Sequence, residues 1–365
     1  MKVYFFFGSL SEFGKHLPDN NVTSIVDLAI KFDEEHRKIS VKGQEIPEEE
    51  KIHYESVVGY SDDYSSLAES TIEGFVNFVF RFDINTLYLQ NPPDSIIRHL
   101  QELPDVSCET DRQKYHSLGL EQLKTVNNTY SDKIIGQDKV RKNLVGALYD
   151  VAKNRYNKPC VMLFYGSTGV GKTETAKFIA DTLNEKLFRK QFSMLHSDEF
   201  TSYLFGGKHS QNSLAKELLE RESNVILFDE FDKPHPVFYS AFYQLFDEGV
   251  FTDKNYTVKM KNAIIICTSN FQTIEEIRER LGDPIFSRFD TIIRFDDLSS
   301  DSVKKIIQRE FDSQYKKLDD NEKQFVDDEN LLFKLLQYSS GLKNARQIKR
   351  VVREAISGIM IKKVL

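Results

Sequence analysis

Three short apolar runs in the second half of the sequence constrain the fold more than any other feature. They read CVMLFYG (160–166), NVILFDEFD (224–232) and NAIIICTSN (262–270), and amphipathic stretches with helical spacing separate them. Runs of this length, rich in β-branched and aromatic residues, are typical of buried strands. Because strands that alternate with helices form parallel sheets with helices on both faces, the pattern predicts an α/β domain. Ligands of such domains lie beyond the carboxyl ends of the strands.

The first run leads into GSTGVGKT, which has the complete spacing of a phosphate-binding loop. Glycines let the backbone turn so that its N–H groups and the next helix N-terminus point at an anion. We therefore predict binding of ATP and Mg²⁺, with Lys172 on the β- and γ-phosphates and Thr173 as a metal ligand. The alternative is a plain glycine turn. The predicted nucleotide-binding residues are Gly166, Ser167, Thr168, Gly169, Val170, Gly171, Lys172 and Thr173.

Polar residues end the other two runs. Asp229 is a candidate to hold Mg²⁺, directly or through water, and Glu230 is a candidate base for an attacking water. Asn270 ends the third run and is a candidate hydrogen-bond partner of the γ-phosphate or of the water. The alternative for Asn270 is that it caps the following helix.

The order of these motifs resembles that of the AAA+ ATPases, and within them the second ATPase module of the Clp-type disaggregases and unfoldases. The resemblance runs from about Gly119 to Leu365. Its most specific part is FDEFDKPHPVFYSAFYQLFDEGVFTD (228–253), which is similar to the Clp-type stretch around the acidic pair. The other matching stretches are IIGQDKVRKNL (134–144), GDPIFSRFD (282–290) and GLKNARQIKR (341–350).

The resemblance implies further site residues. Ile134, Ile135 and Gly136 would line the adenine base, Arg288 would be the arginine finger, and Arg346 would reach the γ-phosphate from the lid. It also implies an ATP-hydrolysing ring, usually hexameric, with ATP between subunits. An arginine from a neighbour adds positive charge to the phosphoryl-transfer transition state only after assembly. Without the family, both arginines read as surface or salt-bridged residues.

Clp-type unfoldases carry a pore loop with an aromatic, aliphatic and glycine tip, and here the corresponding segment is shortened. It runs from Ser197 to Val225 and contains no Gly-Tyr-Val-Gly. Tyr203, Phe205, Gly206 and Gly207 remain. They are either a reduced gripping loop or a turn whose Phe packs in the core.

The chain divides by pattern into four parts. Residues 1–104 are expected to form a small α+β domain for a partner or substrate, with MKVYFFF and NFVFRF (77–82) as strands, and Asp94 as a helix cap. Residues 105–130 are polar and are expected to be a linker. Residues 131–298 would form the AAA+ core, with its phosphate loop and parallel sheet, and residues 299–365, with helical periodicity alone, the helical lid.

Two functions follow from these features. The first is a Clp-like ring that hydrolyses ATP to remodel or unfold protein substrates. The second is an ATP-dependent oligomeric switch or scaffold that engages one dedicated partner through residues 1–104. A net charge of −7 argues against a nucleic-acid partner.

The compartment is also expected from the sequence. The first ten residues, MKVYFFFGSL, contain an apolar run too short for a signal-peptide core, and no later stretch approaches a membrane span. The three cysteines show no CxxC spacing, which fits a reducing compartment. We therefore expect a cytoplasmic protein without a membrane segment.

Overall fold

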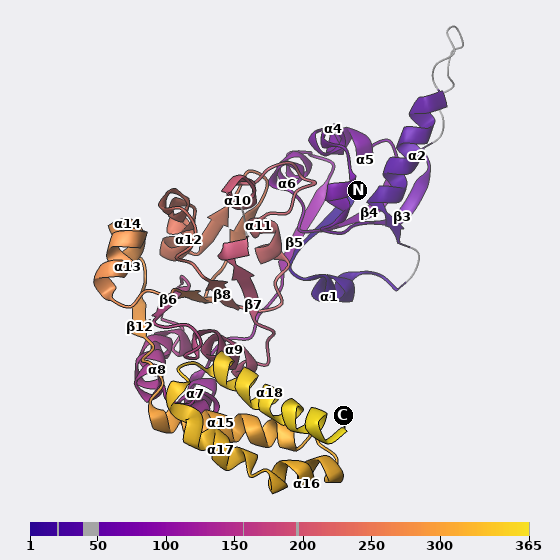
Figure 1. Ribbon diagram of the computed structural model, residues 1–365. Helices are drawn as coiled ribbons and strands as arrows, with labels where there is room; N and C mark the ends of the chain where they lie inside the picture. The colour runs from indigo at the N-terminus through magenta and orange to yellow at the C-terminus, as the bar shows by residue number, and fades with distance from the viewer. Residues whose placement is uncertain (20–21, 39–50, 156, 195–196, 365) are drawn as a thin grey trace. The chain divides into compact units, whose positions relative to one another are not determined.

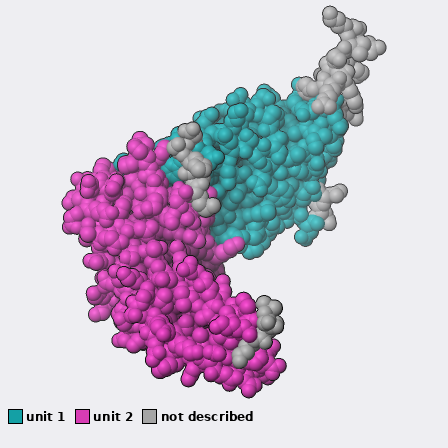
Figure 2. Space-filling model, in the orientation of Figure 1, with its two compact units in different colours: residues 1–115, 194–224, 240–261 teal, residues 116–193, 225–239, 262–365 magenta. Residues whose placement is uncertain are grey.

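The computed structural model describes residues 1–19, 22–38, 51–155, 157–194 and 197–364 (Figure 1). Contacts divide the chain into two compact units (Figure 2). The first contains residues 1–115, 194–224 and 240–261, and the second contains residues 116–193, 225–239 and 262–365. Two segments from the middle of the chain thus pack with the N-terminal region.

A parallel five-stranded sheet forms the centre of the second unit, in the order β12-β6-β11-β8-β7. The three apolar runs become β6 (Cys160–Tyr165), β8 (Val225–Asp229) and β11 (Ile264–Thr268), and every residue of these strands is buried. The outer strands are β7 (Phe188–Gln191) and β12 (Thr291–Arg294). The predicted α/β fold with a parallel sheet is therefore confirmed.

Helices α7 (Leu120–Lys133), α8 (Asp138–Ala152) and α9 (Lys172–Thr182) bury their apolar side chains against this sheet. Tyr130 of α7, for example, meets Phe178 of α9 edge to face, with ring centroids 5.8 Å apart. The shorter helices of this unit are α13 (Ile274–Leu281) and α14 (Asp283–Phe286). Two further short helices, η2 (Phe192–Met194) and η3 (Pro236–Phe242), span its boundaries with the first unit.

Residues 300–364 form the expected helical C-terminal region, which we call the lid. Its elements are α15 (Ser300–Tyr315), α16 (Asp320–Asp328), α17 (Leu331–Gln337), η4 (Tyr338–Gly341) and α18 (Ala345–Val364). They share a separate apolar core in which Ile307, Val326 and Val352 are buried. None of the helices in the described ranges is long and apolar enough to cross a membrane.

The N-terminal region contains a second parallel sheet, in the order β2-β3-β4-β1-β5. Its strands are β1 (Lys2–Phe7), β2 (Thr23–Ser24), β3 (His53–Gly59), β4 (Asp83–Gln90) and β5 (Ser107–Arg112). Its helices are α1 (Leu10–Phe13), η1 (Gly14–His16), α2 (Ile25–Lys38), α3 (Asp63–Ser66), α4 (Glu69–Glu73), α5 (Phe75–Val79) and α6 (Asp94–Gln101). Helices and strands both occur here as expected, but the strands are all parallel, which makes the arrangement α/β.

The expectation that NFVFRF is a strand is wrong. Most of it belongs to α5 and to the turn that follows. Phe75, Phe78 and Phe82 recur at intervals of three and four, so that a helical turn brings them together, and Phe80 is exposed. Phe78 also packs edge to face on Phe32 of α2. Phenylalanine at every second position of NFVFRF is the pattern of a strand, which is why the sequence predicted one.

The expectation that residues 105–130 are a linker is also wrong for part of that range. Residues 107–112 form β5, which pairs in parallel with β1 along its whole length. Its polar composition fits an edge strand, because most of its side chains are at least partly exposed. The helix α7 then begins at Leu120.

The two mid-chain segments in the first unit add α10 (Ser197–Phe205), α11 (Leu214–Leu219), α12 (Tyr243–Glu248) and a hairpin of β9 (Val250–Thr252) and β10 (Thr257–Lys259). They contact residues that follow the strands of the N-terminal sheet. Lys216 of α11 lies 2.9 Å from the carboxylate of Asp62, and Glu69 accepts hydrogen bonds from the backbone and the ring of His209.

Asp94 connects the same parts of the first unit. It is the first residue of α6, after Pro93 at the N-cap, so it is not the cap expected from the sequence. Its carboxylate accepts a hydrogen bond from the Thr257 hydroxyl at 2.7 Å, and its N–H donates to the carbonyl of Asn255 at 2.8 Å. Asp94 thus joins the start of α6 to the β9–β10 hairpin.

We predict that Asp94→Ala lowers the free energy of unfolding by about 1–2 kcal/mol, because the half-buried Thr257 hydroxyl loses its acceptor. Glu102→Ala, at the exposed C-terminal end of the same helix, is the matched control and should change stability by no more than about 0.5 kcal/mol. Urea unfolding curves measure both. Equal midpoints for the two variants would show that this contact adds no stability.

Candidate active site

The phosphate-loop residues lie between β6 and α9 in the second unit, and their conformation requires glycine. Gly166 has φ 129°, and a Cβ atom there would come within 2.3 Å of the carbonyl oxygen of Phe295. Gly171, with φ 114°, stands directly before α9. Because L-residues with a side chain rarely adopt these angles, the loop can form only with glycine at both positions.

A cavity of about 510 Å³ lies over this loop. It brings together residues predicted from five separate parts of the sequence: Ile134, Ile135, Thr168, Gly169, Val170, Gly171, Lys172, Thr173, Asp229, Glu230, Asn270 and Arg346. Gly166, Ser167, Gly136 and Arg288 are not among the residues that line it.

Gly136 differs from its expected place beside the base. It has φ 84°, and a Cβ atom there would lie 2.6 Å from the hydroxyl of Ser302 on α15. Close packing against the lid helix therefore accounts for this glycine. The neighbouring Gln137 is the residue of this stretch that contacts the phosphate loop. Its side-chain amide donates to the carbonyls of Val170, in that loop, and Asp296.

Lys172 is the buried cation of the site. Its ammonium donates to the carbonyls of Gly166 and Ser167 at 2.6 and 2.9 Å, and to the Asn270 side-chain oxygen at 3.2 Å. Burial lowers the pKa of Lys172 to about 8, Asp229 and Asp232 oppose that change, and Arg346 adds to it. Because burial destabilises the charged form of this ammonium, an anionic ligand that restores its charge would bind favourably here.

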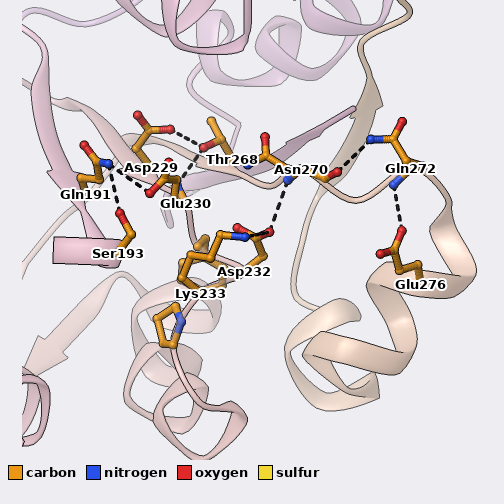
Figure 3. A network of polar contacts seen from close by, with 12 residues as sticks. Gln191, Ser193, Asp229, Glu230, Asp232, Lys233, Thr268, Asn270, Gln272 and Glu276 are labelled. Atoms are coloured by element: carbon orange, nitrogen blue, oxygen red, sulfur yellow. Dashed lines mark hydrogen bonds and ion pairs between the residues drawn. The ribbon is translucent and has the colours of Figure 1, made fainter. Parts of the chain in front are cut away.

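Asp229 ends β8 and accepts hydrogen bonds on both oxygens. Figure 3 shows its contact with Thr268. Oδ1 accepts from the hydroxyl of Thr268 at 2.5 Å. Oδ2 accepts from the guanidinium of Arg189 on β7, at 2.5 and 3.0 Å. Oδ1 keeps a second lone pair, so the group can still act toward a cation or its water.

Glu230 follows with φ 56°, a left-handed conformation that is uncommon for a residue with a side chain. Its N–H donates to the Thr268 hydroxyl at 3.0 Å. Its carboxylate accepts from the amide of Gln191 at 3.0 Å, as Figure 3 shows. Both the backbone and the side chain of Glu230 are thus held by neighbouring strands.

Asn270 directs its side-chain oxygen at Lys172. It is not the cap of the following helix, because α13 has Thr273 at its N-cap, with the hydroxyl accepting from the N–H of Glu276. The capping alternative for Asn270 is therefore wrong. Its N–H lies 3.4 Å from the carboxylate of Asp232.

The two arginines occupy different places. Arg346 lines the cavity at the start of α18, where the N–H of Ala345 donates to the carbonyl of Gly169 at 3.0 Å. Arg288 follows α14, and its guanidinium donates to the carbonyl of Pro284. Of the two, only Arg346 can therefore act in this chain's own cavity.

The residues proposed as a shortened pore loop belong to the first unit. Tyr203 is buried and its hydroxyl donates to the carboxylate of Glu217 at 2.6 Å, whereas Phe205 is 41% exposed. The carbonyl of Phe205 accepts from the N–H of Lys254, and the carbonyl of Gly207 accepts from Asn255. Tyr203 is thus the aromatic residue that packs in the core, and Phe205 lies at the surface.

Gly206 explains why this turn contains glycine. It has φ 81°, and a Cβ atom there would lie 2.9 Å from the backbone nitrogen of Lys254. The backbone of this turn therefore packs directly against the backbone of the β9–β10 hairpin, with no room for a side chain between them.

These residues fit a nucleotide with its metal ion. A glycine loop, the N-terminus of an eleven-residue helix and a buried lysine form a cradle for phosphates. Ile134 and Ile135 supply an apolar wall in the same cavity. Thr173 and Asp229, which also line it, provide the hydroxyl and carboxylate oxygens that Mg²⁺ prefers.

Three polar residues of the site were missed as site residues from the sequence: Arg189, Gln191 and Thr268. Arg189 and Gln191 alternate on β7, which is too short and too polar to show a strand pattern. Thr268 was visible at the end of β11, but nothing in the sequence shows that it faces the acidic pair.

The comparisons with known proteins agree with this geometry. Residues 157–325 match the family described as "AAA domain (Cdc48 subfamily)". The chaperone protein ClpB of Malacoplasma penetrans is 29% identical over 273 residues, which cover 67% of this chain and 39% of that protein. The ClpB of Mycoplasmoides gallisepticum is 30% identical over 272 residues, or 67% and 38% of the two chains.

A third relative is the ATP-dependent Clp protease ATP-binding subunit ClpL of Staphylococcus aureus. It is 31% identical over 216 residues, which cover 52% of this chain and 30% of that protein. The chain thus spans less than two fifths of the length of these curated relatives. Because the matched residues contain the glycine loop, the acidic pair and the parallel sheet that brings them together, residues 157–325 form an AAA+ ATPase domain of the Clp type.

Proposed function

We propose that this protein binds ATP and Mg²⁺ in the cavity over the phosphate loop, hydrolyses ATP as a ring, and thereby remodels protein substrates. The cavity carries the proposal, because it places a buried lysine, two carboxylates and a polar amide around one space. The names of the relatives, a chaperone and a protease subunit, support the remodelling part.

The phosphate end of the cavity is built for an anion. Lys172 now satisfies its ammonium with loop carbonyls, and the β- and γ-phosphates would replace them with opposite charge. Thr173 and Asp229 would hold Mg²⁺, which neutralises charge on the phosphate oxygens.

Hydrolysis requires a group that positions and deprotonates water. Glu230 is the proposed base, since it lines the cavity and is fixed by Thr268 and Gln191. Asn270 would contact the γ-phosphate or the water, and Arg346 would add positive charge from the lid.

Arg288 would complete the site of a neighbouring subunit. It does not line this chain's cavity, and a loose phosphoryl-transfer transition state gains from a further cation. Turnover would therefore depend on assembly, which we propose to be a hexameric ring, as is usual in the family, in the cytoplasm. The proposed parts are residues 131–298 as core, 299–365 as lid and 1–104 as the partner-binding domain.

A specific observation favours the second function, a nucleotide-dependent switch with one dedicated partner. The turn with Phe205 and Gly206 is held by the β9–β10 hairpin, and the same compact unit contains the N-terminal sheet. Nucleotide-driven motion of the turn would therefore be transmitted to the N-terminal sheet. A partner bound there would respond to ATP without being threaded.

Affinity for ATP should fall as the pH rises above about 8, because the free protein must then take up a proton on Lys172. The dissociation constant should rise by up to about tenfold per pH unit there and be flat below. Calorimetric titrations at pH 7, 8, 9 and 9.5 measure it.

Loss of folding would not explain this change. Since the pKa of Lys172 is lowered from 10.5 to about 8, the unfolded chain binds the extra proton between these values. The contribution of Lys172 to the free energy of unfolding thus rises with pH in that window. A constant ATP affinity from pH 7 to 9.5 would contradict the place of Lys172 on the phosphates.

We predict that Arg288→Ala and Glu230→Gln each reduce ATP turnover at least about 100-fold, whereas a mixture of the two recovers part of it. In mixed rings an intact Glu230 would meet an intact Arg288 from the neighbour. Arg280→Ala, an exposed arginine on α13, is the control and should keep full turnover. Two inactive variants whose mixture stays inactive would refute a shared site.

The Glu230→Gln protein should form stable ATP-bound assemblies, because the amide keeps the shape of the side chain without the base. Mass spectrometry of what co-elutes with them separates the two functions. Many unrelated polypeptides at low occupancy would support remodelling. One protein at fixed stoichiometry, lost on deletion of residues 1–104, would support the switch.

A further inference from the structure

One hydroxyl contacts both acidic residues of the site. Thr268 Oγ1 donates its proton to Asp229 Oδ1 at 2.5 Å and accepts the N–H of Glu230 at 3.0 Å. Thr268 is 2% exposed and ends β11, the strand that pairs in parallel with β8. Figure 3 shows its side chain beside both acidic residues.

The contact with Glu230 matters because of the backbone there. A residue with a side chain at φ 56° is less stable than in a right-handed conformation by about 1–2 kcal/mol, so surrounding contacts must hold it. The Thr268 hydroxyl satisfies the Glu230 N–H in that conformation. Without the hydroxyl, this N–H would lack its acceptor at a mostly buried strand end.

The contact with Asp229 fixes the direction of the hydroxyl. A hydroxyl has a single proton, and the carboxylate of Asp229 takes it. The oxygen lone pairs are then left for the N–H of Glu230. The contact with Asp229 therefore orients the Thr268 hydroxyl so that its oxygen can hold the N–H of Glu230.

We propose that Thr268 is a positioning residue for ATP hydrolysis. Its hydroxyl keeps Glu230 in the left-handed conformation that places the Glu230 carboxylate at the cavity, and it connects the metal-side carboxylate to the base. Thr268 acts through Glu230 and takes no part in proton transfer. This inference rests on the proposed hydrolysis of ATP by Glu230.

Two pairs of variants isolate the hydroxyl. Thr268→Val differs from the native residue only by a methyl in place of the hydroxyl, and Thr268→Ala differs from Thr268→Ser in the same group. We expect Val and Ala to lower kcat by about 10- to 100-fold, with KM and ATP affinity within about threefold. Ser should keep kcat within about threefold of the native protein.

Thr182→Val is the matched control. Thr182 ends α9, and its hydroxyl donates to the carbonyl of Phe178 at 2.8 Å, away from the residues that line the cavity. This variant should keep the native kcat. It measures how much kcat changes when a hydrogen-bonded threonine hydroxyl is lost elsewhere in the same unit.

A double-mutant cycle tests whether Thr268 acts through Glu230. In the Glu230→Gln background, Thr268→Ala should lower the residual kcat by less than about twofold, because the group that it positions is already lost. An additive loss would overturn the inference. So would Val and Ala variants that fold and turn over at the native rate, or a Ser variant as slow as Ala.

The remaining outcomes are also decisive. If Val and Ala both fail to fold while Ser folds, the hydroxyl serves stability and the positioning role is refuted. If the native assembly shows no ATP hydrolysis, the proposed function fails before any Thr268 variant is compared.

Discussion

Parallel pairing of β6, β11 and β8 is the constraint on which the rest of the second unit depends. Parallel strands end at the same edge, and here the ends carry the glycine loop, Asn270 and the acidic pair. The strands are wholly buried, so their register is set by apolar packing and cannot slip without exposing that core. The positions of the polar site residues are thus fixed by the packing of an apolar sheet.

A second feature of the site is that each of its charged side chains has a polar partner. Lys172 has carbonyl and amide oxygens, Asp229 has Arg189 and a hydroxyl, and Glu230 has an amide. Buried charges without such partners are costly. The same contacts leave the groups able to exchange partners when phosphates and a cation enter.

In the first unit, segments from the middle of the chain pack against the N-terminal region. The turn at Phe205 and Gly206 has its backbone groups satisfied by the β9–β10 hairpin, and Asp94 joins that hairpin to the N-terminal sheet. The carboxyl ends of the N-terminal strands, where open parallel sheets usually bind ligands, therefore meet the chain's own segments.

Local patterns in the sequence determined much of this protein. The phosphate loop, the three buried strands and the lid helices follow from spacing and from apolar periodicity, which depend on neighbours along the chain. Polar residues at strand ends also predicted Asp229, Glu230 and Asn270 as one site, because parallel strands end together.

Only the tertiary structure decided which side chains meet across strands. Arg189, Gln191 and Thr268 lie 40, 39 and 38 residues from the acidic residues that they hold, and no local pattern records such contacts. Long-range packing likewise made the first half of NFVFRF helical, residues 107–112 an edge strand, and the turn at Gly206 part of the N-terminal unit. Each of these outcomes depends on a distant segment, whose place the local sequence does not specify.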